Sequence, residues 1–356
     1  MASELLGGRV ILHAGDCLDV MAALPENSID ACVTDGPYLL PSIAARFGQA
    51  DAAAAQGRVY QGAMAGFTGN PEIVSDICTR VETWRQVLRV LKPGGHLLAF
   101  GPASIGFSRM HCAIVDAGFE DRGLVDWIYA TGFPKGKPLD KHLDRKLLGD
   151  VCDADELARG PVSHAAAFYA SRDIALKPAK EPIVMARKPL VGTVAENLLA
   201  WGTGSIEIDG CRINGEGYPT NVLLDGSAVV ADAFPRDDQG RTPARFFFSA
   251  KADAHDRAGS DHPTVKPLSL MQYLVRMVTT PGQVVLDPFA GSGTTGEAAW
   301  REGRHAVLVE VNPKFVTAIE RRMSLCLAGP EERKREAIKA KVADQPFEAG
   351  SLFAGM

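Results

Sequence analysis

Apolar residues recur along this chain at two spacings, one typical of buried strands and one typical of amphipathic helices. In the first third of the sequence, short apolar runs predict strands at 9–15, 28–35, 96–100 and 124–130. Steps of three and four predict helices at 17–24, 73–91 and 103–117. The second helix ends at Lys92-Pro93-Gly94-Gly95, because proline and glycine are poor helix formers. This part of the chain therefore alternates strand and helix.

The alternation is lost in the middle of the chain and returns near its end. Between about Thr131 and Asp261 only strand-like islands remain, at 182–187, 205–209 and 245–249. The closing order is strand 283–287, helix 293–303, strand 305–311 and helix 313–325. Alternation at both ends predicts one α/β sheet, doubly wound and mostly parallel, which an insertion interrupts. The Ala/Gly-rich segments at 41–70 and 329–356 predict a loop and a loosely held tail.

Composition restricts the class of protein more than it identifies it. The net charge is −5 and the pI is near 5.9, so any contact with nucleic acid must come from local basic patches. The seven cysteines are scattered and form no C-x-x-C pair, which predicts a reducing cytoplasm and no zinc site. The chain has no run of about 18 apolar residues, so we expect a cytoplasmic protein with no membrane partner.

A glycine-rich segment, LDPFAGSGTTG at residues 286–296, follows a predicted strand and opens a helix. Its glycines match the G-x-G-x-x-G pattern of dinucleotide sites, a match that is weakly specific by itself. Asp287 stands at the strand end, however, where a carboxylate repels a pyrophosphate and suits a ligand ammonium. The next strand brings Glu310, which is placed to accept ribose hydroxyls. These features favour S-adenosylmethionine over NAD or over a turn without a ligand.

A second segment, VTDGPYLL at residues 33–40, ends another predicted strand. Exocyclic amino groups of adenine and cytosine are poor nucleophiles, because the nitrogen lone pair is delocalised into the ring. An enzyme that alkylates such a group must accept hydrogen bonds from both N–H bonds and hold the ring. Asp35 offers a carboxylate, the carbonyl of Gly36 a second acceptor and Tyr38 a stacking face, while Pro37 fixes the turn. These four residues are the predicted catalytic set.

Together the two segments resemble the DNA amino-methyltransferases that modify adenine N6 or cytosine N4. The signature of that family is Asp/Asn/Ser-Pro-Pro-Tyr after a strand, with a Phe-x-Gly-x-Gly cofactor loop. Here Asp35 precedes Phe289, which is the order of the permuted β class. EPIVMARK at 181–188 is similar to a strand of the family near the target base. HPTVKP at 262–267 is similar to the segment that packs against the methionine end of the cofactor.

The resemblance covers roughly residues 9–133 and 181–326, and it implies a site for S-adenosylmethionine without a metal. It places Asp16 near the cofactor's adenine. Lys266 either neutralises the cofactor's carboxylate or is simply solvated. The cofactor residues that we expect are Asp16, Lys266, Asp287, Pro288, Phe289, Ala290, Gly291, Gly293, Thr294, Glu310 and Asn312. The partner implied is double-stranded DNA, with the target base flipped out of the duplex.

The same resemblance implies a division of the chain and a terminal antiparallel hairpin in the sheet. The expected parts are a catalytic half at 1–132, a target-recognition insertion at 133–261 with a core strand at about 181–188, a cofactor-binding half at 262–328 and a tail at 329–356. Of the three residues Phe246, Phe247 and Phe248, we expect at least two in the core. A restriction–modification enzyme of a bacterial or phage-infected cell, acting as a monomer or homodimer, fits this reading.

Gly36 departs from the signature, since the family usually has proline at this position. Glycine keeps the carbonyl but loses preorganisation worth roughly 0.4–1 kcal/mol, so we expect reduced activity, or else an altered target. Asp35, rather than serine, favours adenine over cytosine. RNA or a protein amide stays open as a substrate, because an amide NH₂ poses the same chemical problem. A catalytically inactive DNA-binding module is a further alternative.

Overall fold

The computed structural model describes residues 2–37, 77–102, 105–130, 139–149, 160–250 and 265–329, together with the single positions 256, 258, 260, 262, 332 and 335. Within this part of the chain, ten strands form one sheet in the order β1-β2-β10-β9-β3-β4-β6-β5-β7-β8. The strands are β1 (Ala2–Leu5), β2 (Val10–Ala14), β3 (Ile29–Asp35), β4 (Leu91–Phe100), β5 (Glu120–Ile128), β6 (Lys180–Arg187), β7 (Val222–Leu224), β8 (Phe248–Ser249), β9 (Val284–Asp287) and β10 (His305–Glu310).

The sheet is mostly parallel, as its apolar runs predict, because strands buried on both faces read as continuous apolar segments. β2, β10, β9, β3 and β4 run in one direction, and β1 is antiparallel to β2 at the edge. β6 pairs antiparallel with both β4 and β5, so the expected antiparallel pair is present. Two short strands, β7 and β8, continue the sheet in parallel beyond it.

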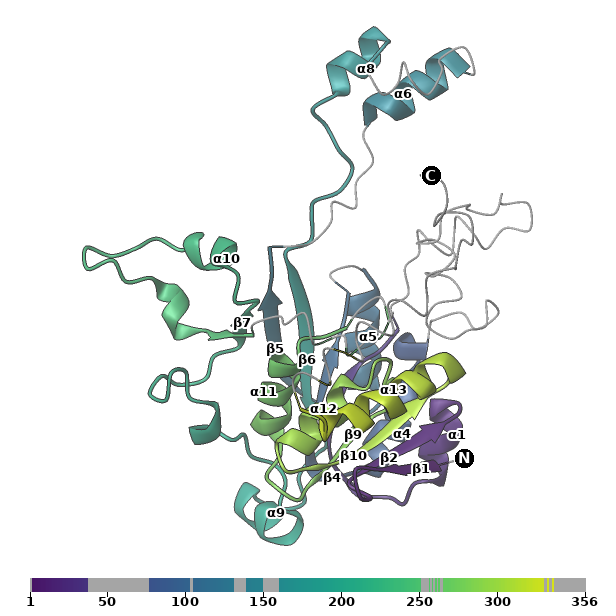
Figure 1. Cartoon of the computed structure of the whole chain (residues 1–356), viewed down its shortest axis with the longest axis vertical. Coiled ribbons are helices and arrows are strands. Elements are labelled where there is room, and N and C mark those ends of the chain that lie inside the picture. The colour runs from purple at the N-terminus through teal and green to yellow at the C-terminus, as the bar shows by residue number, and fades with distance from the viewer. Residues whose placement is uncertain are drawn as a thin grey trace, which may run out of the picture.

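Helices cover both faces of this sheet (Figure 1). The α-helices are α1 (Cys17–Ala23), α4 (Val81–Val90), α5 (Ile105–Asp116), α6 (Leu139–Leu148), α8 (His164–Tyr169), α9 (Val194–Trp201), α10 (Ala228–Asp232), α11 (Leu268–Val278), α12 (Thr294–Arg301) and α13 (Pro313–Cys326). The part of the chain that the structure describes also contains the short 3₁₀ helices η1 (Ile77–Thr79), η3 (Asp209–Cys211) and η4 (Pro243–Phe246).

Successive residues of each central strand point to opposite faces and so join different cores. In β3, Ala31 and Val33 belong to the cluster under α11, α12 and α13, whereas Cys32 belongs to the cluster under α1, α4 and α5. Trp84 of α4 is fully buried in the second cluster, as the helical spacing predicts. The predicted doubly wound α/β architecture is confirmed.

Two strands predicted within the insertion, at 205–209 and 245–249, differ in the structure. Residues 205–208 form no strand, and 209–211 are the 3₁₀ helix η3. This segment lies along α11, where the Glu207 amide donates to the Met277 carbonyl at 2.9 Å, instead of joining the sheet. In the 245–249 island only Phe248 and Ser249 are strand, because Thr242 caps a 3₁₀ helix that has Pro243 in its first turn.

Boundaries elsewhere also differ from the sequence prediction: of the helix predicted at 73–91, residues 77–79 are the 3₁₀ helix η1 and α4 begins only at Val81. Lys92 to Gly95 end α4 as expected, yet they already lie inside β4, whose pairing with β3 is shifted between Ile29 and Ala31. Residues 73–76 of the predicted helix, and the predicted loop at 41–70, lie outside the described residues.

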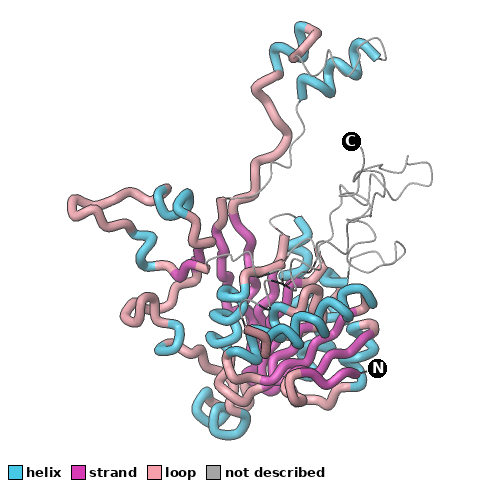
Figure 2. Tube along the Cα trace, in the orientation of Figure 1, coloured by secondary structure: helices cyan, strands magenta, loops and turns pink. Residues whose placement is uncertain are grey.

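Two projections leave the body of the molecule (Figures 1 and 2). The first carries α6 and α8 and connects β5 to β6. The second, called here the lobe, is residues 225–247 between β7 and β8 and contains α10 and η4. β5, β7 and β8 run in the direction of β4, so both projections begin at the carboxyl ends of strands. None of the described helices is long and apolar enough to span a lipid bilayer.

Candidate active site

Acidic residues stand at or just after the carboxyl ends of four neighbouring parallel strands. Asp16 follows β2, Glu310 ends β10, Asp287 ends β9 and Asp35 ends β3. Sheets of this kind bind ligands at this edge. A pocket there is lined by Asp35, His262, Lys266, Met271, Asp287, Phe289, Ala290, Gly291, Ser292, Thr294 and Thr295. The fold thus brings Asp35 and the glycine-rich loop, which are far apart in sequence, to one pocket.

Asp287 is the buried anchor of the glycine-rich loop. Its Oδ1 accepts hydrogen bonds from Thr34 Oγ1 at 2.6 Å and from the Phe289 amide at 3.1 Å. Its Oδ2 accepts from Thr295 Oγ1 at 2.6 Å. Burial raises the pKa of Asp287 to about 6, although these hydrogen bonds act in the opposite direction. Asp287 therefore ties the end of β9 both to β3 and to the first turn of α12.

Glu310 holds the same loop from the neighbouring strand. Its Oε2 accepts from the Gly291 amide and its Oε1 accepts from the Asn312 amide, each at 2.8 Å. Burial raises the pKa of Glu310 to about 7, against the effect of these two N–H groups. A carboxylate offers about four acceptor positions, so Glu310 keeps capacity for two more donors.

The loop requires glycine at two positions. Gly291 and Gly293 have φ of +51° and +75°, a region that other residues rarely adopt. A Cβ at Gly291 would lie 2.9 Å from Nε2 of His262, and one at Gly293 would lie 3.1 Å from Ile319. Glycine at these two positions therefore lets the loop pack against the side chains of His262 and Ile319. Thr294 then begins α12, whose N-terminal end attracts anionic or electron-rich groups.

The catalytic turn predicted at Asp35 to Tyr38 packs directly on this loop. A Cβ at Gly36 would lie 2.3 Å from Sγ of Cys78 and 3.1 Å from Cδ2 of Phe289. Cys78 is buried, and its carbonyl accepts from Trp84 Nε1 at 2.8 Å. Gly36 is therefore enclosed by η1 on one side and by the cofactor loop on the other. Tyr38 lies outside the described residues.

Lys266 joins two carboxylates across the pocket. Its Nζ lies 2.5 Å from Oδ2 of Asp35 and 3.2 Å from Oε1 of Glu181, and 4.8 Å from the centre of the Phe100 ring. Burial alone would lower the pKa of Lys266, but the carboxylates of Asp35 and Glu181 outweigh it and raise that pKa above its ordinary value. The ammonium stays charged and fixes the Asp35 carboxylate.

Two of the expected cofactor residues act as helix caps. Asp16 is exposed, and its Oδ1 accepts from the Leu18 amide at 2.8 Å at the start of α1. Asn312 is buried, and its Oδ1 accepts from the Lys314 amide at 3.0 Å at the start of α13. Pro288, Phe289 and Ala290 connect β9 to the loop, and the Ala290 amide donates to the Val309 carbonyl at 2.9 Å.

Among the residues of the site that had no assigned role in the sequence analysis are Thr34, Cys78, Glu181 and Thr295. Thr34 and Thr295 adjoin predicted motifs, so a search for hydroxyl donors beside a strand-end acid would have found them. Glu181 opens a segment already singled out by resemblance. Cys78 left no signal, because it reaches the turn only through the packing of η1.

The residues present suit S-adenosylmethionine. Carboxylates at adjacent strand ends match a ligand that carries an ammonium and a ribose, and the glycine-rich loop lines the pocket beside them. No pyrophosphate-binding cation lies among the described residues that line the pocket other than Lys266, which is paired with carboxylates. The pocket therefore fits an amino-acid nucleoside better than a dinucleotide.

Known proteins are similar to this chain. The type II methyltransferase M.HindIII of Haemophilus influenzae is 26% identical over 240 residues, which cover 65% of this chain and 64% of that protein. The DNA adenine methyltransferase YhdJ of Escherichia coli K12 is 34% identical over 84 residues, covering 24% and 29%. The matched segments thus span less than two thirds of either relative.

Among solved structures, the cytosine-N4-specific PvuII DNA methyltransferase is 16% identical with a TM-score of 0.48, covering 93% of this chain and 92% of that one. The sequence profile of the N6/N4 methyltransferases, described as DNA methylase, matches residues 29–321. That range contains both Asp35 and the glycine-rich loop and extends over most of the sequence. The chain therefore belongs to the N6/N4 DNA methylase family of S-adenosylmethionine-dependent DNA methyltransferases.

Proposed function

We propose that this chain transfers the methyl group of S-adenosylmethionine to the N6 amino group of adenine in double-stranded DNA. The observation that carries the proposal is that Asp35 and the glycine-rich loop line one pocket. A methyl acceptor held by Asp35 would then lie beside a methyl donor held by the loop. Positioning of this kind supplies a large part of the rate enhancement in a bimolecular transfer.

In this proposal the catalytic turn binds the amino group. The Asp35 carboxylate and the Gly36 carbonyl accept hydrogen bonds from the two N–H groups of the target amino group. These hydrogen bonds localise the lone pair on the nitrogen. Pro37 fixes the turn and Tyr38 stacks on the base. Lys266 supports this role, because its ammonium holds the Asp35 carboxylate in place through Oδ2. The target base must leave the duplex, at a cost of a few kcal/mol.

The proposed cofactor residues belong to the loop and to the neighbouring strand ends. Bound S-adenosylmethionine supplies an electrophilic methyl group. The segment Asp287 to Thr294 would cradle its methionine part, and Glu310 would accept its ribose hydroxyls. Asp16 and Asn312 would flank the adenine end from their cap positions. Lys266 is within the pocket as well, so its pair with Asp35 and its proposed contact with the cofactor carboxylate compete for one ammonium.

Adenine is the proposed target for two reasons. Residue 35 is aspartate, as the sequence analysis favours for adenine. The relative with the higher identity, at 34%, is described as a DNA adenine methyltransferase. Cytosine N4 presents the same amino-group chemistry and is the outcome to be distinguished by experiment.

DNA is the proposed partner because the two projections leave the sheet at the edge that holds Asp35 (Figure 1). We propose that the insertion at 133–261 recognises the target sequence, between the catalytic half at 1–132 and the cofactor-binding half at 262–328. A methyltransferase of proteins or of small amides has no need for projections of this kind.

The test is incubation of unmethylated duplex DNA with the protein and S-adenosylmethionine, followed by nucleoside mass spectrometry. We expect N6-methyladenine. If N4-methylcytosine formed instead, the target base would be cytosine, and the proposal of a DNA methyltransferase would stand. Methylation of RNA or protein in parallel reactions, with none on DNA, would contradict the proposal.

A further inference from the structure

The lobe, residues 225–247, is a built projection with its own small core. At its base, Asp225 Oδ2 accepts from the Ala130 amide at 3.1 Å, and its Oδ1 accepts from Ser227 Oγ at 2.6 Å. Inside, Leu224, Val230 and Ala244 are buried against neighbouring apolar side chains. β7 runs in the direction of β4 and β3, so the lobe leaves the sheet at the same edge as Asp35.

A hollow on this lobe is rich in arginine. It is lined by Pro235, Arg236, Asp237, Arg241, Thr242, Pro243, Arg245 and Phe246. Two of the arginines are fixed within the lobe: Arg236 binds Asp232 at 2.8 Å and Arg241 binds Asp237 at 2.7 Å. These exposed pairs add little free energy, but they hold the turn from Arg236 to Arg241 in one shape.

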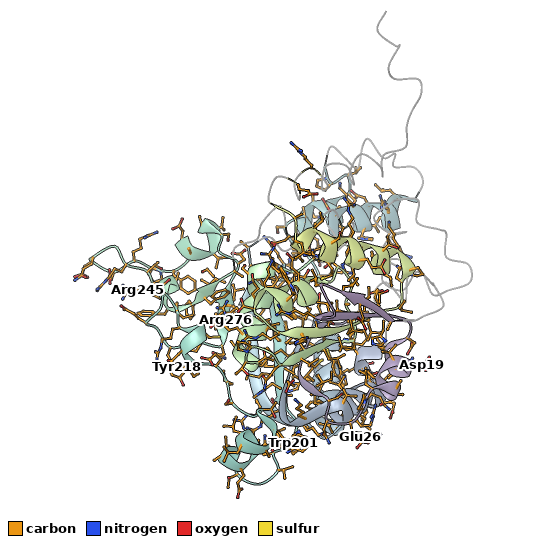
Figure 3. The ribbon with its side chains drawn as sticks, turned by 60° about the horizontal axis from the view of Figure 1, so that its bottom comes forward. Asp19, Glu26, Trp201, Tyr218, Arg245 and Arg276 are labelled. Atoms are coloured by element: carbon orange, nitrogen blue, oxygen red, sulfur yellow. The ribbon has the colours of Figure 1, made fainter. Side chains whose placement is uncertain are left out.

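Arg245 differs from these two arginines. Its guanidinium lies 4.7 Å from the centre of the Phe246 ring, and among the described residues it makes no direct ion pair, although its charge helps to lower the pKa of Asp237 in the same hollow. Its backbone is held, because the Asn214 side chain donates to the Arg245 carbonyl at 3.4 Å. Figure 3 shows Arg245 on the outer part of the lobe, with Tyr218 on the loop beside it. A charged group is thus presented to solvent on a fixed backbone.

Phe246 is the outward member of three consecutive phenylalanines. Phe247 packs against Phe234 with ring centres 5.6 Å apart, and Phe248 stacks on Tyr273 at 3.9 Å. Phe246 is instead 53% exposed. The two inward rings anchor η4, so the apolar face of the third has no neighbour in the core to cover it. An exposed aromatic ring beside an exposed guanidinium suits a ligand with both an anion and a flat apolar face.

We infer that Arg245 and Phe246 form a contact site for DNA next to the target base. Arg245 binds a backbone phosphate, and the ring of Phe246 packs on the adjoining sugar and base. Nucleic acid carries these two features at a constant spacing, and arginine with an aromatic residue is a common means of binding them. The inference rests on the proposed function and names the surface by which the insertion meets its substrate.

The test measures equilibrium binding of a fluorescent DNA duplex at several salt concentrations. Arg245→Ala should weaken binding and lower the slope of log affinity against log salt by about 1, because one phosphate contact is lost. Arg245→Lys should keep the slope, since it keeps the charge. Phe246→Ala should weaken binding by roughly tenfold with the slope unchanged.

Two control variants each change another exposed apolar residue. Val229→Ala changes a 70% exposed apolar residue on α10 of the same lobe, and Leu199→Ala changes a 90% exposed residue on α9. Both should bind DNA like the wild type. Every variant keeps Phe247 and Phe248, so we expect the lobe to stay folded. Thermal unfolding of each variant checks this.

The outcomes separate this inference from the proposed function. If wild-type protein methylates DNA while Arg245→Ala and Phe246→Ala bind it unchanged, the contact site is refuted and the activity stands. If the variants change the oligomeric state instead of DNA affinity, the surface joins two copies of the chain and the inference is wrong. If the wild type methylates no DNA, the proposed function itself fails.

Discussion

At the scale of single residues, Gly36 has a structural reason that its sequence context does not reveal. The family signature usually has proline at this position, so the sequence alone predicts that glycine makes the catalytic turn less rigid. In the structure, the space that a side chain at position 36 would need is occupied by Cys78 and Phe289. The turn is therefore held by packing, and glycine is required by its neighbours.

We predict that Gly36→Ala destabilises the protein by about 1–3 kcal/mol, the usual cost of overpacking a buried site. Cys78→Ala should offset that cost in the double variant, because it removes the Sγ that lies 2.3 Å from the new Cβ. Urea unfolding of the four proteins measures the coupling between the two positions. Additive effects of the two substitutions would show that Cys78 does not determine the residue at position 36.

Glu310 gives the cofactor site a dependence on pH. Its pKa is raised by burial to about 7, so in the free protein the carboxylate forms as the pH rises through neutrality. Ribose hydroxyls donate to the charged form, and binding therefore strengthens as the pH rises and levels off above that pKa. We expect S-adenosylmethionine to bind roughly tenfold more tightly at pH 8 than at pH 6.

Isothermal titration calorimetry at several pH values measures this trend. Glu310→Gln should bind more weakly at pH 8 and show a flatter profile. An unchanged pH profile in that variant would assign the dependence to another group, such as Asp287, whose pKa is raised to about 6.

At the scale of secondary-structure elements, the central part of the fold is readable from the sequence. β2, β3, β9 and β10 are continuous apolar runs that end in an acid or just before one, so both the strands and the site residues can be predicted. β7 and β8 contain only three and two residues, too few for a periodic pattern. The residues at 205–209 alternate like a strand, yet a contact with α11 holds the segment outside the sheet.

Side-chain contacts between elements far apart in the chain could not be predicted from the sequence. Lys266 reaches Asp35 and Glu181 across separations of 231 and 85 residues, and no local spacing encodes such a contact. The sequence analysis included Lys266 among the expected cofactor residues. In the structure, however, its shortest contact is with Asp35 of the catalytic turn. The caps made by Asp16 and Asn312 are, in contrast, local features that follow from their position before a helix.

The loop before α12 allows a matched test of its proposed role. Gly291 and Gly303 lie before and after this helix, with φ of +51° and +79°. Alanine at either position costs about 1 kcal/mol of backbone strain, because both conformations are left-handed, and Gly291→Ala adds a steric clash with His262. Only Gly291→Ala should weaken S-adenosylmethionine binding, since its Cβ would lie 2.9 Å from His262, whereas a Cβ at Gly303 would meet nothing closer than 3.8 Å. If calorimetry gave the Gly291→Ala and Gly303→Ala variants the same affinity for S-adenosylmethionine, the loop would not be part of the cofactor site.

At the scale of the whole molecule, the sheet edge combines three parts that are far apart in sequence. The catalytic turn comes from the first third of the chain, the cofactor loop from the last, and the projections from the middle (Figure 1). The net charge of −5 offers no general attraction to DNA. DNA binding must then depend on local groups and decrease steeply with salt.

The central claim is that Asp35 and the glycine-rich loop form one methyl-transfer site. Its most direct test compares the wild type with Asp35→Asn, a variant of nearly the same shape, in single-turnover reactions with saturating S-adenosylmethionine and duplex DNA. Cofactor affinity is measured on the same samples. We expect N6-methyladenine from the wild type and a loss of roughly 100-fold or more in rate for the variant, with cofactor binding retained. A variant that methylates DNA at the wild-type rate would contradict the account.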